Sequence, residues 1–102
     1  MDYKCSQTDR VMTVAFFGDI DEFACRTLRS DIDAKIVGSA PKEVIFDLNG
    51  VSFVDSTGIG FILGRYKKLC VAGGRLKLAN VPPQVDKVFR TSGVYSVVEK
   101  VR

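Results

Sequence analysis

The sequence contains no histidine and no tryptophan, and it has only three cysteines. Without histidine the chain lacks the commonest general base and the commonest metal-binding side chain, so a Ser-His-Asp triad is excluded. The cysteines, Cys5, Cys25 and Cys70, are odd in number and far apart, with no Cys-x-x-Cys pair. They predict reduced, largely buried thiols in a cytosolic protein and no metal site. We therefore expect a protein that is not an enzyme and that uses no cofactor.

The chain also lacks a long apolar run and a concentrated block of charge, and the polar residues near its start predict no secretory leader. Its 102 residues are 46% apolar and 26% charged, which is ordinary for one globular domain. The net charge of +3 comes from 15 basic residues scattered among 12 acidic ones, and only Lys67-Lys68 form a basic pair. We therefore expect a soluble cytoplasmic protein with no membrane segment and no direct nucleic-acid partner.

Hydrophobic periodicity predicts alternating strands and helices. Segment 43–48 has few polar residues, which is typical of a strand covered on both faces at the centre of a sheet. Residues 49–55 are expected to form a loop. The expected strands are 3–8, 11–17, 43–48, 75–80 and 96–101, and the expected helices are 23–37, 56–71 and 81–91. Apolar residues recur at steps of four in the first helix, at Ala24, Leu28, Ile32 and Ile36.

The order of these elements predicts the fold class. Successive strand-helix-strand units imply a mostly parallel sheet with right-handed crossovers, and the short polar break at residues 7–10 predicts an opening antiparallel hairpin. The chain is therefore expected to be an α/β protein with a five-stranded sheet and with helices packed mainly on one side. The second helix should face the sheet with Ile59, Ile62, Leu63, Tyr66, Leu69 and Cys70.

The segment from Asp55 to Gly60 places hydroxyl groups where a buried strand gives way to a helix, which is the edge where open α/β sheets carry their sites. Two interpretations of Ser56 stay open on the residues alone. Its oxygen could cap the helix, with Gly58 and Gly60 permitting close packing, or its hydroxyl could be a regulatory site. A hydrolase is excluded because Val54 stands where a nucleophile elbow needs glycine.

A specific resemblance begins in this segment. It resembles the phosphorylation-site region of STAS-domain anti-sigma factor antagonists, closest to the sporulation branch. Three further motifs extend the resemblance over most of the chain. The matching segments are Val51-Ser52-Phe53-Val54-Asp55-Ser56-Thr57-Gly58-Ile59-Gly60, Gly18-Asp19-Ile20-Asp21, Phe46-Asp47-Leu48 and Phe89-x-x-Ser92-Gly93.

The resemblance implies a regulatory cycle. In this family the serine at the position of Ser56 is phosphorylated by an anti-sigma factor serine kinase, and a PP2C-type phosphatase removes the phosphate. The unmodified antagonist binds the kinase and releases the sigma factor, in sporulation or in stress responses. The resemblance implies that phosphorylation is on Ser56 and that the partner binds Asp21, Asp55, Ser56, Thr57, Gly58, Ile59 and Gly60.

Two alternatives remain beside this interpretation. The chain could be a small-molecule or lipid-binding STAS module in which the Ser56 loop holds a ligand, or a STAS subunit of another signalling assembly. Similar proteins usually carry a further C-terminal helix, whereas this chain ends at Val101-Arg102. The sequence therefore predicts one STAS domain over residues 1–102 without that helix.

Overall fold

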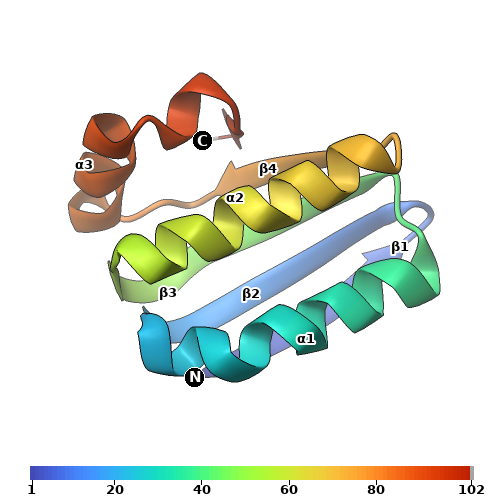
Figure 1. Ribbon diagram of the computed structural model, residues 1–102, viewed down its shortest axis with the longest axis horizontal. Helices are drawn as coiled ribbons and strands as arrows, with labels where there is room; N and C mark the ends of the chain where they lie inside the picture. The colour runs from blue at the N-terminus through green and yellow to red at the C-terminus, as the bar shows by residue number, and fades with distance from the viewer. Residues whose placement is uncertain (102) are drawn as a thin grey trace.

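The computed structural model describes residues 1–101, and Arg102 lies outside the described residues. Five strands form one sheet in the order β1-β2-β3-β4-β5 (Figure 1). β1 pairs with β2 antiparallel, and all other pairs are parallel. The elements in chain order are β1 (Asp2–Thr8), β2 (Val11–Ile20), α1 (Glu22–Ser39), β3 (Glu43–Val54), α2 (Ser56–Val71), β4 (Arg75–Ala79), α3 (Pro83–Ser92), a 3-10 turn η1 (Val94–Ser96) and β5 (Glu99–Val101).

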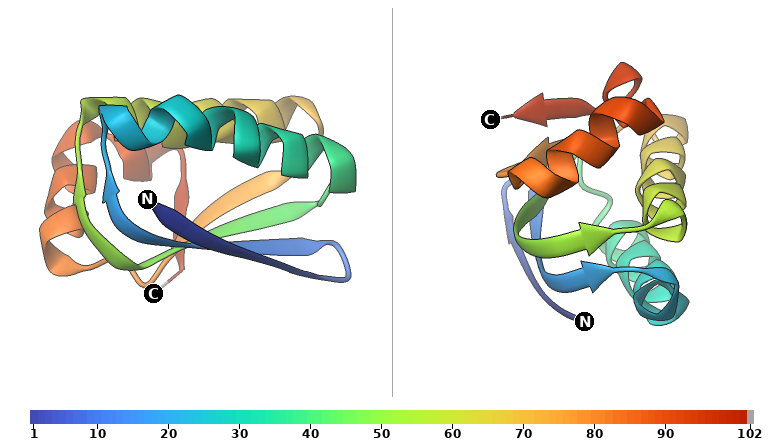
Figure 2. Two further views of the ribbon diagram at one scale, coloured as in Figure 1. Left: turned by 90° about the horizontal axis from the view of Figure 1, so that it is seen from below. Right: turned by 90° about the vertical axis from the view of Figure 1, so that its left-hand side faces the viewer.

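The helices leave one face of the sheet bare. α1 and α2 lie side by side across the other face, and α3 packs beyond the carboxyl ends of β3 and β4 (Figure 2). This confirms the predicted α/β class and the helices mainly on one side. β3 lies at the centre of the sheet as predicted, but the expected cover on both of its faces is wrong, because Ile45 and Asp47 stay partly exposed on the bare face. None of the helices described combines the length and the apolarity needed to cross a membrane.

The core lies between the sheet and the α1–α2 layer. Alternate residues of β2 from Met12 to Phe16 and of β3 from Val44 to Leu48 are buried, as the period of two in a strand requires. The rings of Phe16 and Phe46 meet edge to face with centroids 5.0 Å apart, and Phe61 of α2 stacks on Phe46 at 5.9 Å. All four apolar residues predicted for the first helix are buried, which confirms its apolar face. On α2, Ile62 and Leu69 are buried, and Ile59, Leu63 and Tyr66 pack against the core.

Two strands extend beyond their predicted ends. β2 continues through Gly18 to Ile20, and β3 continues through the expected loop to Val54. Gly18 has φ 113°, a value that suits glycine, and the pairing shifts register on either side of Phe17 and Gly18. The pairing of Ile20 with Val54 therefore carries both strands to the points where α1 and α2 begin.

The C-terminal segment holds α3 to the edge of the sheet. The expected strand 96–101 is shorter in the structure, where η1 comes first and β5 covers only Glu99–Val101. The carboxylate of Asp86 in α3 accepts a hydrogen bond from the Tyr95 hydroxyl at 2.6 Å and one from Lys100 Nζ at 2.9 Å. Its other oxygen lies 2.8 Å from Arg90 Nε. Hydrogen bonds from Tyr95 and Lys100 hold the pKa of Asp86 at about 2.

Candidate functional site

The carboxyl ends of β2 and β3 bring the first turns of α1 and α2 together. Asp21 caps α1, because its Oδ1 accepts the N–H of Ala24 at 2.9 Å. Asp55 caps α2 in the same way, with Oδ1 accepting the N–H of Gly58 at 2.8 Å. The second oxygen of Asp55 accepts the N–H of Glu22, the first residue of α1, at 3.1 Å. One carboxylate therefore joins two helix N-termini, and negative charge is favoured there.

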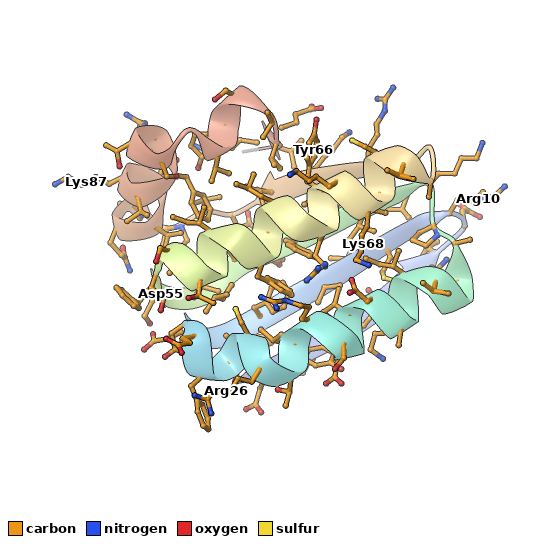
Figure 3. All side chains as sticks on the ribbon, viewed as in Figure 1. Arg10, Arg26, Asp55, Tyr66, Lys68 and Lys87 are labelled. Carbon is orange, nitrogen blue, oxygen red and sulfur yellow. The ribbon has the colours of Figure 1, made fainter. Side chains whose placement is uncertain are left out.

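Ser56 stands at this junction with its side chain exposed. The interpretation of Ser56 as the helix cap is wrong, because Asp55 fills that role and Ser56 is the first residue of α2. Among the side-chain hydrogen bonds found in residues 1–101, none involves the Ser56 hydroxyl, whereas Ser92 and Ser96 bond carbonyls in their own turns. The hydroxyl of Ser56 is therefore open to a partner. Figure 3 shows Asp55 at the start of α2, beside the start of α1.

We call Asp21, Asp55, Ser56 and Thr57 the acceptor edge. The structure brings these predicted residues together at one end of the α1–α2 layer. Thr57 is half-buried, and its carbonyl oxygen lies 3.9 Å from the sulfur of Cys25, which donates to it. Burial, with the charge of Asp55 second, raises the pKa of the Cys25 thiol. Only this cysteine is buried, so the prediction of largely buried thiols is wrong for Cys5 and Cys70.

The two glycines of the motif have different surroundings. A Cβ on Gly58 would lie 2.1 Å from the carbonyl oxygen of Ile20 and 2.8 Å from the Val54 side chain. Gly58 therefore lets α2 approach the end of β2 closely, as the sequence suggested. A Cβ on Gly60 would meet nothing within 4 Å, and Gly60 is exposed. Close packing inside the molecule thus explains Gly58 but not Gly60. Ile59 lies partly buried against the core and contributes to packing.

Sequence reasoning missed two exposed aromatic side chains next to the acceptor edge. Phe23 is 77% exposed and follows Glu22, whose N–H binds Asp55. Phe53 is 51% exposed and lies three residues before Ser56. The signal for Phe23 was present in the sequence, because Phe23 lies outside the step-of-four apolar face of the first helix. Exposed apolar side chains that are rimmed by polar residues are typical of interaction surfaces.

A buried ion pair between α1 and α2 was also missed by the sequence analysis. Arg65 of α2 is only 4% exposed, and its Nε lies 2.8 Å from Oδ1 of Asp33 in α1. Neither atom completes a hydrogen bond of good geometry, so the contact is a charge pair rather than an aligned bond. Burial lowers the pKa of Arg65, and the charge of Asp33 opposes that shift. The Arg65 guanidinium also lies over the ring of Phe61 at 5.0 Å, within the range of a cation–π contact.

Fold and site together define a compact α/β domain, with a bare sheet face and an exposed serine where Asp55 joins the N-termini of two helices. The profile of the STAS domain matches residues 3–102, so the chain belongs to the STAS domain family. A relative from Lysinibacillus sphaericus named anti-sigma F factor antagonist is 37% identical over 87 residues, covering 85% of this chain and 74% of the relative.

Two solved structures of SpoIIAA share the fold. The structure of the anti-sigma factor antagonist SpoIIAA in its unphosphorylated form has a TM-score of 0.84 and 30% identity, covering 99% of this chain and 89% of that chain. The structure of the Bacillus cell fate determinant SpoIIAA in the phosphorylated form has a TM-score of 0.75 and 29% identity, covering 99% and 92%. The suspected family is thus confirmed.

Proposed function

We propose that this chain is an anti-sigma factor antagonist that is switched by phosphorylation of Ser56. In the unphosphorylated form it binds an anti-sigma factor serine kinase and releases the sigma factor. Phosphorylation ends that binding, and a PP2C-type phosphatase restores it. The observation that carries the proposal is the exposed Ser56 hydroxyl, which Asp55 leaves free by capping α2 in its place. The names of the relatives support it, including a SpoIIAA solved in unphosphorylated and phosphorylated forms.

The charges around Ser56 explain how a phosphate would act. A phosphoryl group adds about −1.5 to −2 charge and three acceptor oxygens. The N–H groups of Gly58, Glu22 and Ala24 already donate to the carboxylates of Asp55 and Asp21. A phosphate on Ser56 therefore finds several nearby donors occupied and two carboxylates close by. It would project away from the protein and alter what a partner meets, with no change of backbone required.

The surroundings of Ser56 also suggest how the partner is held. Phe23 and Phe53 present aromatic rings beside the acceptor edge, and Gly60 offers bare backbone one turn into α2. Aromatic side chains are enriched at interfaces, where a few well-packed residues commonly supply most of the binding energy and a polar rim surrounds them. In the proposed contact, Phe23 and Phe53 are the anchors, and the Ser56 hydroxyl lies among the polar side chains of the acceptor edge. A docked kinase would enclose the Ser56 hydroxyl, so that added volume and charge there oppose binding.

The experiment combines modification with binding. The purified protein is incubated with its cognate anti-sigma factor kinase and ATP, and phosphate is located by mass spectrometry. We expect it on Ser56, and we expect Ser56→Ala to remain unmodified. Calorimetric titration of the kinase with Ser56→Asp should show affinity at least about tenfold lower than wild type, since a charge conflict at a packed contact commonly exceeds 1.4 kcal/mol.

A matched control separates charge at the acceptor edge from charge in general. Ser6→Asp places the same charge on an exposed serine of β1, and it should bind as wild type does. Equal affinity of Ser56→Asp and wild type, with equal folding by circular dichroism, would mean that the kinase docks elsewhere. The alternative in which the Ser56 loop holds a ligand would then account better for this edge.

A further inference from the structure

A groove of about 520 Å³ lies between the last turns of α1 and α2. Lys68 lies between the two helices near this end, whereas Asp55 lies at the opposite end of α2 (Figure 3). The two residues are 13 positions apart, about 20 Å along a helix. The groove is therefore separate from the acceptor edge. Its volume falls within the range of about 300–1,000 Å³ that is usual for small-molecule pockets.

The walls of this groove are apolar. Ile36 and Leu69 form part of the lining from the core side, and Pro41 closes it after α1. Val37 and Val71 stand on the two helices and are 81% and 92% exposed. A helix gains nothing from an isolated valine in water, since valine has lower helix propensity than alanine. Two exposed valines that line one groove favour an occupant with an apolar body.

The charges at the groove favour an anion. Lys67 and Lys68 both line it and are exposed, and Asp33 supplies the single carboxylate among the lining residues. That carboxylate forms ion pairs with the buried Arg65 at 2.8 Å and with Lys68 Nζ at 3.7 Å, so the charge of Arg65 offsets it and Lys68 is partly engaged. The C-terminal ends of the two helices carry a partial negative charge of about one half each, which opposes an anion at the last turn. Because Arg65 offsets the charge of Asp33, the two positive charges of Lys67 and Lys68 exceed the roughly one negative charge of the two helix ends.

We propose that this groove binds a small amphipathic carboxylate, such as a medium-chain fatty acid, with its apolar body against Val37, Ile36 and Val71 and its carboxylate at Lys67 and Lys68. An ammonium group binds a carboxylate more strongly than it binds a neutral hydroxyl, so the anionic head group should be required. The inference does not rest on the function of Ser56, because it uses other residues at the other end of the layer.

The test is a calorimetric titration with sodium decanoate below its micelle concentration. We expect saturable binding at one site with a Kd of about 1 mM or tighter, which corresponds to −4.1 kcal/mol. Decanol, which has the same body and no charge, should bind at least about tenfold more weakly. Amide shifts in heteronuclear NMR should gather at the last turns of α1 and α2. The variant Ser56→Asp should bind decanoate as wild type does.

Matched charge reversals identify the head-group site. Lys67→Glu combined with Lys68→Glu should weaken decanoate at least about tenfold. Lys87→Glu, on an exposed lysine of α3, should leave binding unchanged. Three outcomes overturn the proposal: no saturation while the protein is folded, equal binding of decanoate and decanol, or equal binding by the double variant. Binding of an acidic amphipathic peptide in place of decanoate would reassign the groove to a protein partner.

Discussion

At the scale of single residues, replacing Gly58 or Gly60 with alanine should change the stability of the protein in opposite directions. Gly58→Ala places a methyl group against the Ile20 carbonyl, and overpacking of this kind costs about 1–3 kcal/mol. Gly60→Ala puts its methyl group in open space and removes the entropic penalty of glycine in a helix, so it should stabilise by about 0.5–1 kcal/mol. Urea denaturation of both variants beside wild type measures the difference.

The same pair tests whether Gly60 serves the partner. If the kinase approaches the bare backbone of α2, Gly60→Ala should bind the kinase more weakly although it is the more stable protein. Equal shifts in stability for the two alanines would contradict the packing described for Gly58. Unchanged kinase affinity in Gly60→Ala would remove Gly60 from the proposed contact.

The sequence predicts that a cap begins α2 but does not predict which residue supplies it. Asp55 and Ser56 are both good cap residues, and they are adjacent. Local preference alone does not choose between them. The choice follows from a contact that is distant in sequence, because the second oxygen of Asp55 also accepts the N–H of Glu22. The buried position of Arg65 has the same origin, since its partner Asp33 lies on the other helix.

At the scale of elements, α3, η1 and β5 are tied together by one carboxylate. The folded pKa of Asp86 is about 2, below its ordinary value of 3.8. Its contribution to stability is therefore present above about pH 4 and is lost as pH falls through 2. In Asp86→Asn the free energy of unfolding should therefore fall less than in wild type as the pH drops from about 4 to 2. Tyr95→Phe removes the shortest hydrogen bond to the carboxylate and should reduce this fall in part.

Urea denaturation of the three proteins at steps from pH 2 to 7 provides the measurement. Wild type and Asp86→Asn should differ in slope on the acid side and run parallel toward neutrality. An identical slope for both proteins from pH 4 to 2 would show that this carboxylate does not couple the three elements.

Elements with strong periodicity were predictable, and their ends were not. The apolar face of α1 is confirmed because it repeats at the helical period within one segment. The extension of β3 to Val54 depends on pairing with β2 past Gly18, which requires register shifts that no local pattern in either strand contains. The short β5 follows from the turn η1, which forms where the sequence alone predicted a continuous strand.

At the scale of the whole molecule, the reaction rates of the three cysteine thiols measure how tightly α1 and α2 cover the core. Cys5 and Cys70 are exposed and should react with a neutral thiol reagent in the folded protein. Cys25 is 3% exposed under α2, and the higher pKa of its thiol lowers the thiolate fraction further. If it is reached only by global unfolding that costs about 5 kcal/mol, it should react about 5,000-fold more slowly than an exposed thiol.

Mass spectrometry of timed labelling reactions follows the three sites separately. Added urea should accelerate modification of Cys25 in proportion to the unfolded population and leave the other two rates nearly constant. Labelling of Cys25 at the rate of Cys70 in the absence of urea would mean that α1 separates from α2 in the native state.

The two outer strands of the sheet have a consequence for how copies of the chain meet at high concentration. An unpaired strand edge is a template for further strands, and natural proteins protect such edges with charge and with short length. β1 is polar along most of its exposed side, and β5 spans three residues that include Glu99 and Lys100. Beside β5, the first residues of β4 have no strand partner on their outer side in the described part of the chain, and Arg75 places a charge there. Adding a further strand at either edge would remove these charged side chains from water, so we expect the sheet to resist edge-to-edge pairing even though one of its faces is bare.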